Sequence, residues 1–323
     1  HQRNVSKNTI ASYRDSFVQF INYMKGINGI PVERLLLKHL TRDNVINYLQ
    51  WLHNTKKNTS ATCNYRLAAI RSFCSYLQYI VIDNMVEWQS ILSIKAKKTE
   101  ISPPNYLSME GIKLLLAQPD TTSWKGRRHL ALLSLMYDTG ARVQEIADLT
   151  VDCVRIDTTP YTIRLTGKGR KTRIVPLAEA QVDILRSYME ENNLNDPNMI
   201  KKPLFFNGRH EKLTREGITY ILKIYADMAN KQQPEIIPKK ISCHSIRHSK
   251  AMHLLQAGVN LVYIRDILGH VSIQTTDIYA RADSKAKREA LENAYTRLTP
   301  NTITEKEWER NKNLLEWLKG LGH

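Results

Sequence analysis

The sequence has little of several features that mark whole classes of protein. Its 323 residues include only four cysteines, and no two of them form a Cys-x-x-Cys pair. This argues against a disulfide framework or a zinc site and predicts reduced, mostly buried thiols. The longest apolar runs, such as 130–137, are too short to span a bilayer, and the first residues lack the apolar core of a signal peptide. We therefore expect a cytoplasmic protein without a membrane partner.

Positive charge, in contrast, is in excess. Lys and Arg outnumber Asp and Glu by 47 to 31, which gives a net charge of +16 and an isoelectric point near 9.6. The excess is shared between the first 97 residues and the remainder. Cations that neutralise phosphates release counterions, so a charge of this size favours a nucleic-acid partner. Charge alone leaves open a basic protein that is merely soluble.

The first hundred residues predict helices only. Apolar residues with a period near 3.6 follow the candidate N-caps Ser6, Thr41 and Thr59 or Ser60, which indicates a small helical bundle. A lysine-rich stretch with a proline pair then interrupts the pattern, and we interpret it as a domain boundary. We predict a helical domain over 1–97, a linker over 98–104 and a second domain over 105–323.

The second domain predicts mainly α structure with a small antiparallel β-sheet. Helical patterns near 108–118 and 124–138 give way to alternation over 162–165 and 172–175, with 151–154 leading into it. The turn over 167–170 is typical of a short hairpin. Further helices are expected over 179–192, 215–229, 244–256, 259–268 and, at the C-terminus, 305–321.

Two basic side chains occupy positions that could serve an anion. Arg142 follows a glycine turn and could aim its planar fork at a phosphate, with Glu145 holding it through a charge-assisted pair. Lys168 lies between two glycines at the hairpin tip, where an ammonium could reach a ligand and donate a proton. Each residue alone is more often a solvated surface cation.

A second group lies further along the chain. His244 and Arg247 are three residues apart at a helix start, so they share a face beside an anion-attracting N-terminus. His248 is expected to pack or hydrogen-bond inside. Gly269 ends the next helix, followed by His270 and, nine residues later, Tyr279. A tyrosine phenol, with a pKa near about 10, needs neighbouring cations or a base to act as a nucleophile.

In this order, the motifs resemble those of the tyrosine recombinases, the phage-integrase superfamily. The resemblance covers nearly the whole chain and rests on residues 139–146, 167–169, 244–248, 268–270 and Tyr279. Every catalytic position of the family pattern is filled. Arg281 is a departure, because many members have histidine there. The resemblance implies a helical core-binding domain and a mixed α/β catalytic domain that form a C-shaped clamp.

The resemblance also implies a mechanism without metal, ATP or any other cofactor. Arg142 and Arg247 would clamp the non-bridging oxygens of a DNA phosphate, and His270 would add a hydrogen bond. Attack by Tyr279 would leave a 3′-phosphotyrosyl bond and a free 5′-hydroxyl.

The remaining motif residues assist this step. His244 would be the acid–base partner of the Tyr279 hydroxyl, and Lys168 would protonate the departing 5′ oxygen. Glu145 and His248 would hold these catalytic groups in position.

The implied partners are duplex DNA at specific core sites and three further copies of the chain, as a tetramer on two duplexes. Asn64, Arg66 and Arg71 lie among the non-core residues of a predicted helix and are candidates for DNA contacts. Accessory proteins could set direction, and the protein is expected at the bacterial nucleoid. The C-terminal helix could dock on a neighbour or fold back on its own domain.

Two other functions are alternatives, although the helical N-terminal domain, the compact length and the intact catalytic set favour a recombinase. A type IB topoisomerase uses similar chemistry without exchanging partners, and a catalytically silent DNA-binding regulator could share the fold. Within the family, integration or transposition of a mobile element is favoured over resolution or inversion. The target sequence, cleavage in cis or in trans, and an arm-binding domain before His1 are undetermined at this stage.

Overall fold

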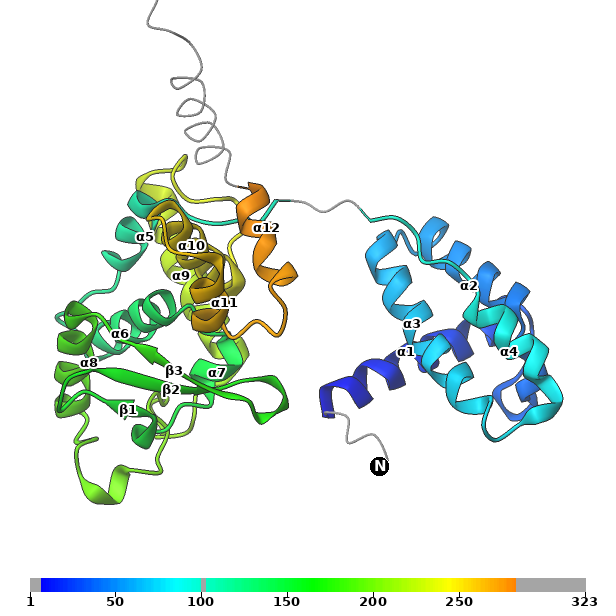
Figure 1. Ribbon diagram of the computed structural model, residues 1–323, viewed down its shortest axis with the longest axis horizontal. Helices are drawn as coiled ribbons and strands as arrows, with labels where there is room; N and C mark the ends of the chain where they lie inside the picture. The colour runs from blue at the N-terminus through cyan, green and yellow to red at the C-terminus, as the bar shows by residue number, and fades with distance from the viewer. Residues whose placement is uncertain (1–6, 100–102, 283–323) are drawn as a thin grey trace, which may run out of the picture. The chain divides into compact units, whose positions relative to one another are not determined.

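The computed structural model describes residues 7–99 and 103–282, apart from the side chains of Lys7 and Lys168. The chain divides into two compact units, His1–Ser102 and Pro103–His323 (Figure 1). The described residues are mainly helical, with one three-stranded antiparallel sheet, so the predicted fold class is confirmed. None of the described helices is long and apolar enough to cross a membrane.

The described residues of the first unit form four α-helices, with short 3₁₀ turns between α1 and α2 and between α3 and α4. Thr41 and Thr59 cap α2 and α3 as predicted, because their hydroxyls accept hydrogen bonds from backbone N–H groups of the first turn. Ser6, the predicted cap of α1, lies outside the described residues. The last helix, α4, was not predicted. The bounds are α1 Lys7–Gly26, α2 Arg42–Asn54, α3 Ser60–Leu77 and α4 Met85–Leu92.

Aromatic rings fill the core of this unit. Phe20, Tyr23 and Tyr48 lie with their centroids 5.2–6.5 Å apart, and each such side chain stabilises the fold by about 1.5–3 kcal/mol through burial. Helix α1 departs from expectation at its start. Ile10 and Tyr13 follow the apolar period but are exposed, so the buried residues of α1 begin only at Ser16.

The sheet of the second unit has the order β1-β2-β3, with antiparallel pairing throughout. Its strands are β1 Val154–Arg155, β2 Thr162–Thr166 and β3 Thr172–Pro176. The predicted β2–β3 hairpin is confirmed. The segment 151–154, expected to lead into the strand over 162–165, is instead a 3₁₀ turn, Val151–Cys153, followed by the start of β1. Side chains two apart on a strand share a face, so Arg173 lies on the same face of β3 as the buried Val175.

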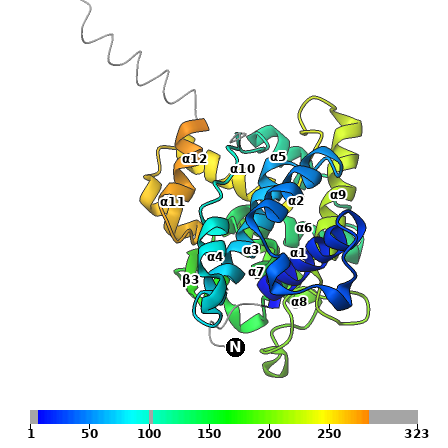
Figure 2. The same cartoon turned by 90° about the vertical axis from the view of Figure 1, so that its right-hand side faces the viewer.

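The described residues of the second unit also form eight helices. Helix α6 packs against α8, and α11 packs against β3, while α10, α11 and α12 contact one another (Figures 1 and 2). The short α7 was not predicted, and the predicted helix over 305–321 lies outside the described residues. The bounds are α5 Met109–Leu116, α6 Trp124–Thr139, α7 Val143–Ala147, α8 Glu179–Glu191, α9 Arg215–Gln232, α10 Cys243–Gln256, α11 Leu261–Leu268 and α12 Gln274–Ala282.

Candidate functional site

Two helix ends position the predicted cations in the second unit. Gly140 ends α6 and Gly269 ends α11, each with a positive φ that a residue with a side chain rarely adopts. A Cβ at Gly140 would lie only 2.8 Å from the Leu268 side chain, so these two helix ends are in direct contact. Arg142 follows the first glycine and His270 follows the second, which brings two motifs far apart in sequence to one place.

Arg247 is the fifth residue of α10 and is almost fully buried, at 4% exposure. Its guanidinium donates hydrogen bonds to the carbonyl oxygens of Gly140, at 2.8 Å, and Leu268, at 2.7 Å. Burial, followed by repulsion from Arg142, lowers the pKa of Arg247 to about 10. No carboxylate among the described residues pairs directly with it. Because a buried charge is costly without a counter-charge, this arrangement favours binding of an anion.

Arg142 lies beside it and is held by Glu145. The Nη1 atom donates to Glu145 Oε1 at 2.9 Å, and Nη2 donates to the carbonyl oxygen of Gly269 at 3.2 Å. Glu145 also accepts the backbone N–H of Arg142 at 2.8 Å, which caps the N-terminus of α7. A guanidinium has five N–H groups, so both arginines keep donors for a ligand after these contacts.

A third arginine, Arg173, belongs to this cluster and was missed by the sequence analysis. Its Nη1 and Nη2 atoms donate to the two carboxylate oxygens of Glu145 at 2.9 and 2.7 Å, and its Nε donates to the carbonyl oxygen of Ile267 at 2.8 Å. Burial alone would raise the pKa of Glu145, but the hydrogen bonds from Arg173 and Arg142 lower it to about 2. The sequence signal for Arg173 was its position two residues before Val175, which places a charged side chain on the core-facing side of a strand.

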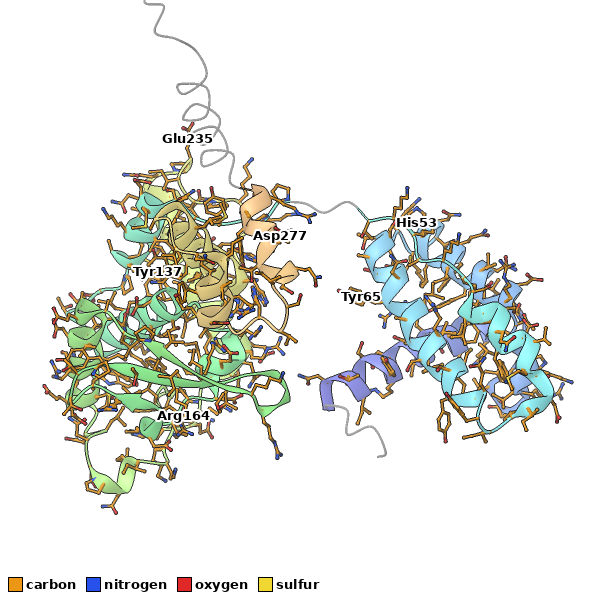
Figure 3. All side chains as sticks on the ribbon, in the orientation of Figure 1. His53, Tyr65, Tyr137, Arg164, Glu235 and Asp277 are labelled. Atoms are coloured by element: carbon orange, nitrogen blue, oxygen red, sulfur yellow. The ribbon has the colours of Figure 1, made fainter. Side chains whose placement is uncertain are left out.

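Tyr279 lies against the same cluster, on α12, whose first turn contains Asp277 (labelled in Figure 3). The Tyr279 ring stacks near the ring of His270, with centroids 6.4 Å apart. Its hydroxyl is 2.9 Å from Nδ1 of His248, and the residue is only 1% exposed. Burial raises the pKa of the phenol, whereas the charges of Arg247 and Arg142 act to lower it.

The histidines differ in their partners. Nδ1 of His270 is 2.9 Å from the hydroxyl of the buried Thr276, so a hydrogen bond to a ligand would come from its Nε2. Burial lowers the pKa of both His248 and His270 to about 4, with further lowering by nearby cationic groups, so both are neutral at neutral pH. His244 is exposed, with its ring centroid 6.3 Å from that of His248. Partial burial and the charges of Arg247 and Arg142 lower its pKa.

Lys168 begins the 3₁₀ turn Lys168–Arg170 between β2 and β3. Its side chain is outside the described set, so the predicted position of its ammonium beside the site stays a prediction. The hairpin itself borders the site, because the neighbouring Gly167 lines a groove of about 480 Å³ together with Arg142, Arg173 and His270.

The three residues predicted to touch DNA lie on α3 in the first unit. Asn64 exchanges two hydrogen bonds with the backbone of Lys97, at 2.8 and 2.9 Å, and Arg66 donates to the hydroxyl of Ser16 at 2.9 Å. Arg71 is partly buried. Asn64 and Arg66 thus make hydrogen bonds within the unit, and a role of these residues in DNA binding stays a prediction.

A buried phenol next to two arginines and two histidines is the arrangement of a tyrosine recombinase. Comparison with family models gives the same class. The phage integrase family matches residues 105–286, and the phage integrase N-terminal SAM-like domain matches residues 1–79. The chain belongs to the phage integrase family and is a tyrosine site-specific recombinase.

Similar proteins cover almost the full length of the chain. The putative integrase/recombinase y4rC of Sinorhizobium fredii is 32% identical over 320 residues, which cover 99% of this chain and 94% of that protein. The tyrosine recombinase XerD of Listeria monocytogenes serotype 4b is 31% identical over 280 residues, covering 86% and 89%. The similarity thus extends over most of the length of both relatives.

Solved structures share the fold. The XerH recombinase bound to a palindromic difH substrate, in a post-cleavage complex, is 25% identical with a TM-score of 0.67, covering 90% of this chain and 80% of that one. The Tn1549 transposon integrase in complex with transposon right end DNA has a TM-score of 0.67 at 17% identity, covering 90% and 94%. At that identity the likeness concerns the fold alone.

Proposed function

We propose that the chain cuts and rejoins DNA strands at specific sites through a 3′-phosphotyrosyl intermediate on Tyr279. The observation that carries this proposal is the position of the phenol. Its ring lies against His270, its hydroxyl is 2.9 Å from His248, and the charge of the buried Arg247 acts on it. A phenol is a weak nucleophile at neutral pH, and nearby cations are what lower the energy of its anion.

Arg142 and Arg247 are proposed to bind the non-bridging oxygens of the scissile phosphate. Charge on these oxygens grows in the transition state, and fixed donors in a site shielded from water stabilise it without having to reorganise. Nε2 of His270 would donate to the same phosphate, because Thr276 occupies its Nδ1. In an enzyme of acyl transfer, one such donor is worth about 10²–10³ in rate.

Proton transfer is assigned to two further residues, His244 and Lys168. In the described conformation the partner of the Tyr279 hydroxyl is His248, which is neutral and can accept the hydrogen bond. We propose that the phenol leaves His248 when it attacks and that the exposed His244 serves as its acid–base partner. Lys168 is proposed to protonate the departing 5′ oxygen, with Glu145 and His248 in supporting positions.

The two units are proposed to share the work, with residues 1–97 as the core DNA-binding domain, 98–104 as the linker and 105–323 as the catalytic domain. Asn64, Arg66 and Arg71 remain the candidates for DNA contacts in the first unit. We propose a C-shaped clamp on duplex DNA, assembled as a homo-tetramer on two duplexes at the bacterial nucleoid. The net charge of +16 supports a DNA partner.

Integration or transposition of a mobile element is the biological role that we propose. It is supported by the similarity to a putative integrase/recombinase over nearly the full length of both chains. Accessory proteins that set the direction of the reaction are compatible with this role. A type IB topoisomerase and a silent regulator are less favoured, because the two similar proteins named above are a putative integrase/recombinase and a tyrosine recombinase.

Capture on nicked duplexes tests the proposal. A library of duplexes with a nick near each candidate site lets the short strand diffuse away after cleavage, so that the covalent complex accumulates. We expect a covalent complex whose captured strand defines one site, and no complex for Tyr279→Phe although DNA binding persists. The matched control is Tyr263→Phe, which changes an exposed tyrosine on α11 and should leave capture intact. Absence of any complex in the unchanged protein would contradict the proposal, and plasmid relaxation without recombination of paired sites would favour a topoisomerase.

A further inference from the structure

Arg173 has no place in the recombinase motifs, yet its side chain joins three segments that carry them. It lies on β3, shortly after the hairpin turn that contains Lys168. Its Nε binds the carbonyl oxygen of Ile267 near the end of α11, three residues before His270. Its two Nη atoms bind the carboxylate of Glu145 at the start of α7. All three guanidinium nitrogens are therefore engaged within the protein.

Glu145 links Arg173 to Arg142. Oε1 accepts from Nη1 of both arginines, at 2.9 Å in each case, and Oε2 accepts from Arg173 Nη2 at 2.7 Å and from the backbone of Arg142 at 2.8 Å. The Glu145 side chain is only 2% exposed, and that of Arg173 is 12% exposed. Because both carboxylate oxygens bind Arg173 as well as Arg142, the plane of the Arg173 guanidinium sets the plane of the carboxylate. The carboxylate in turn sets the direction of the Arg142 fork.

Two glycines of the recognised motifs pack directly on this pair. A Cβ at Gly269 would lie 2.8 Å from Arg173 Nη1, and a Cβ at Gly167 would lie 2.9 Å from Glu145 Oε1. Real Cβ atoms essentially never approach so closely, so any side chain at either glycine would push the pair aside. The Arg173–Glu145 pair is thus the common support of the His270 loop, the Lys168 hairpin and Arg142.

We propose that Arg173 is a positioning residue that acts through Glu145 to orient Arg142 toward the scissile phosphate, an inference that rests on the proposed function. Arg173 itself is not a catalytic residue in this scheme. Arginine is required because a planar fork can bind both carboxylate oxygens and a third acceptor at fixed angles. Lysine offers one flexible ammonium and cannot hold the carboxylate plane.

A double-mutant cycle tests the route through Arg142. The quantity measured is the single-turnover rate of covalent strand capture at saturating DNA, for Arg173→Gln, Arg142→Ala and the double variant. A misplacement of about 1 Å can cost about 10²-fold in rate, and we expect a loss of this order for Arg173→Gln. In the Arg142→Ala background the same change should cost less than about threefold. Losses that multiply, as for a residue that contacts the phosphate independently, would overturn the proposal.

The matched control is Arg164→Gln, on the neighbouring strand β2 (Figure 3). Arg164 also pairs with a carboxylate, that of Asp152 at 3.0 Å, but away from the site residues. We expect its capture rate to stay within about twofold of the unchanged protein. An equal loss in both variants would mean that any loss of a strand arginine slows capture, and the proposal would fail.

A neutral phosphate analogue separates positioning from a merely structural role. A methylphosphonate at the scissile position lacks the charge that the arginine clamp stabilises. The loss in Arg173→Gln should therefore shrink on this substrate, together with the loss in Arg142→Ala. A purely structural defect would slow both substrates equally and would refute the proposal.

If Arg173→Gln does not fold, as judged by thermal unfolding, Arg173→Lys replaces it with the same criteria. The two proposals fail in different ways. An unchanged protein that never forms a covalent complex contradicts the proposed function. A covalent complex that forms at full rate in the Arg173 variant contradicts only the role of Arg173.

Discussion

Replacement of Glu145 by Gln should destabilise the second unit by about 3 kcal/mol at neutral pH. The carboxylate accepts four hydrogen bonds from two arginines with its side chain 2% exposed. Its negative charge also acts to raise the pKa of the buried Arg247, which stabilises the charge of that guanidinium. Gln keeps the shape of the Glu145 side chain but removes its negative charge. It therefore leaves Arg142, Arg173 and Arg247 to repel one another.

The magnitude follows from the pKa of Glu145. Burial alone would raise it, but the hydrogen bonds from Arg173 and Arg142 lower it from 4.5 to about 2. A lowered carboxyl pKa stabilises the folded state above the unfolded value of 4.5, and this stability is lost as the pH falls through about 2. The difference corresponds to about 3 kcal/mol. In other proteins, removal of one partner from a buried ion pair costs about 3–5 kcal/mol of stability, which is similar to this difference.

Urea unfolding of the full chain, followed by far-ultraviolet circular dichroism, measures this effect across a pH series. The free-energy difference between the unchanged protein and Glu145→Gln should be about 3 kcal/mol at neutral pH and should shrink as the pH approaches about 2. Asp152→Asn is the matched control, because this carboxylate pairs with Arg164 and Lys201 in a more exposed place. We expect less than about 1 kcal/mol there. A difference for Glu145→Gln that is below about 1 kcal/mol, or that does not change with pH, would refute the reasoning.

Three further outcomes are expected. His248→Ala and Tyr279→Phe each remove the same hydrogen bond, so their effects on unfolding free energy should couple by about 1 kcal/mol in a double-mutant cycle, and additive effects would contradict the contact. The His270 ring should titrate near pH 4 in the free protein, as measured by NMR. Its pKa should rise once inorganic phosphate binds, because an anion stabilises the imidazolium. A pKa near the ordinary histidine value without phosphate would contradict this expectation. Arg247→Lys should slow strand capture by about 10²–10³-fold, because one ammonium cannot bind two carbonyl oxygens and a phosphate, and a loss of DNA affinity equal to the loss of rate would contradict this.

Much of the fold could be predicted because its signals are local. The N-caps at Thr41 and Thr59 and the alternation in β2 and β3 act over a few residues. Helix α4 gave no such signal. The β-branched run before it favours extended structure, and its N-cap Asn84 makes no side-chain cap hydrogen bond. Burial of Trp88 and Ile91 against the other helices stabilises it, and that contact is tertiary.

The candidate site was predictable only where spacing encodes it. His244 and Arg247 share a helix turn, so their proximity follows from sequence. Arg173 and Glu145 are 28 residues apart, and only the folded hairpin joins them. The contact of His248 with Tyr279 spans 31 residues and depends on the packing of α12 against α10. Burial of the phenol is a property of that packing, and the sequence carries no local sign of it.

The most direct test of the account is to identify the amino acid that carries the DNA. The covalent complex would be digested with protease and nuclease, and mass spectrometry would locate the remaining nucleotide among the 15 tyrosines. The account predicts a 3′-linked nucleotide on the peptide that contains Tyr279 and on no other. A nucleotide on a different residue, or one linked through its 5′ phosphate, would contradict the central claim that the cations around Tyr279 make this phenol the nucleophile.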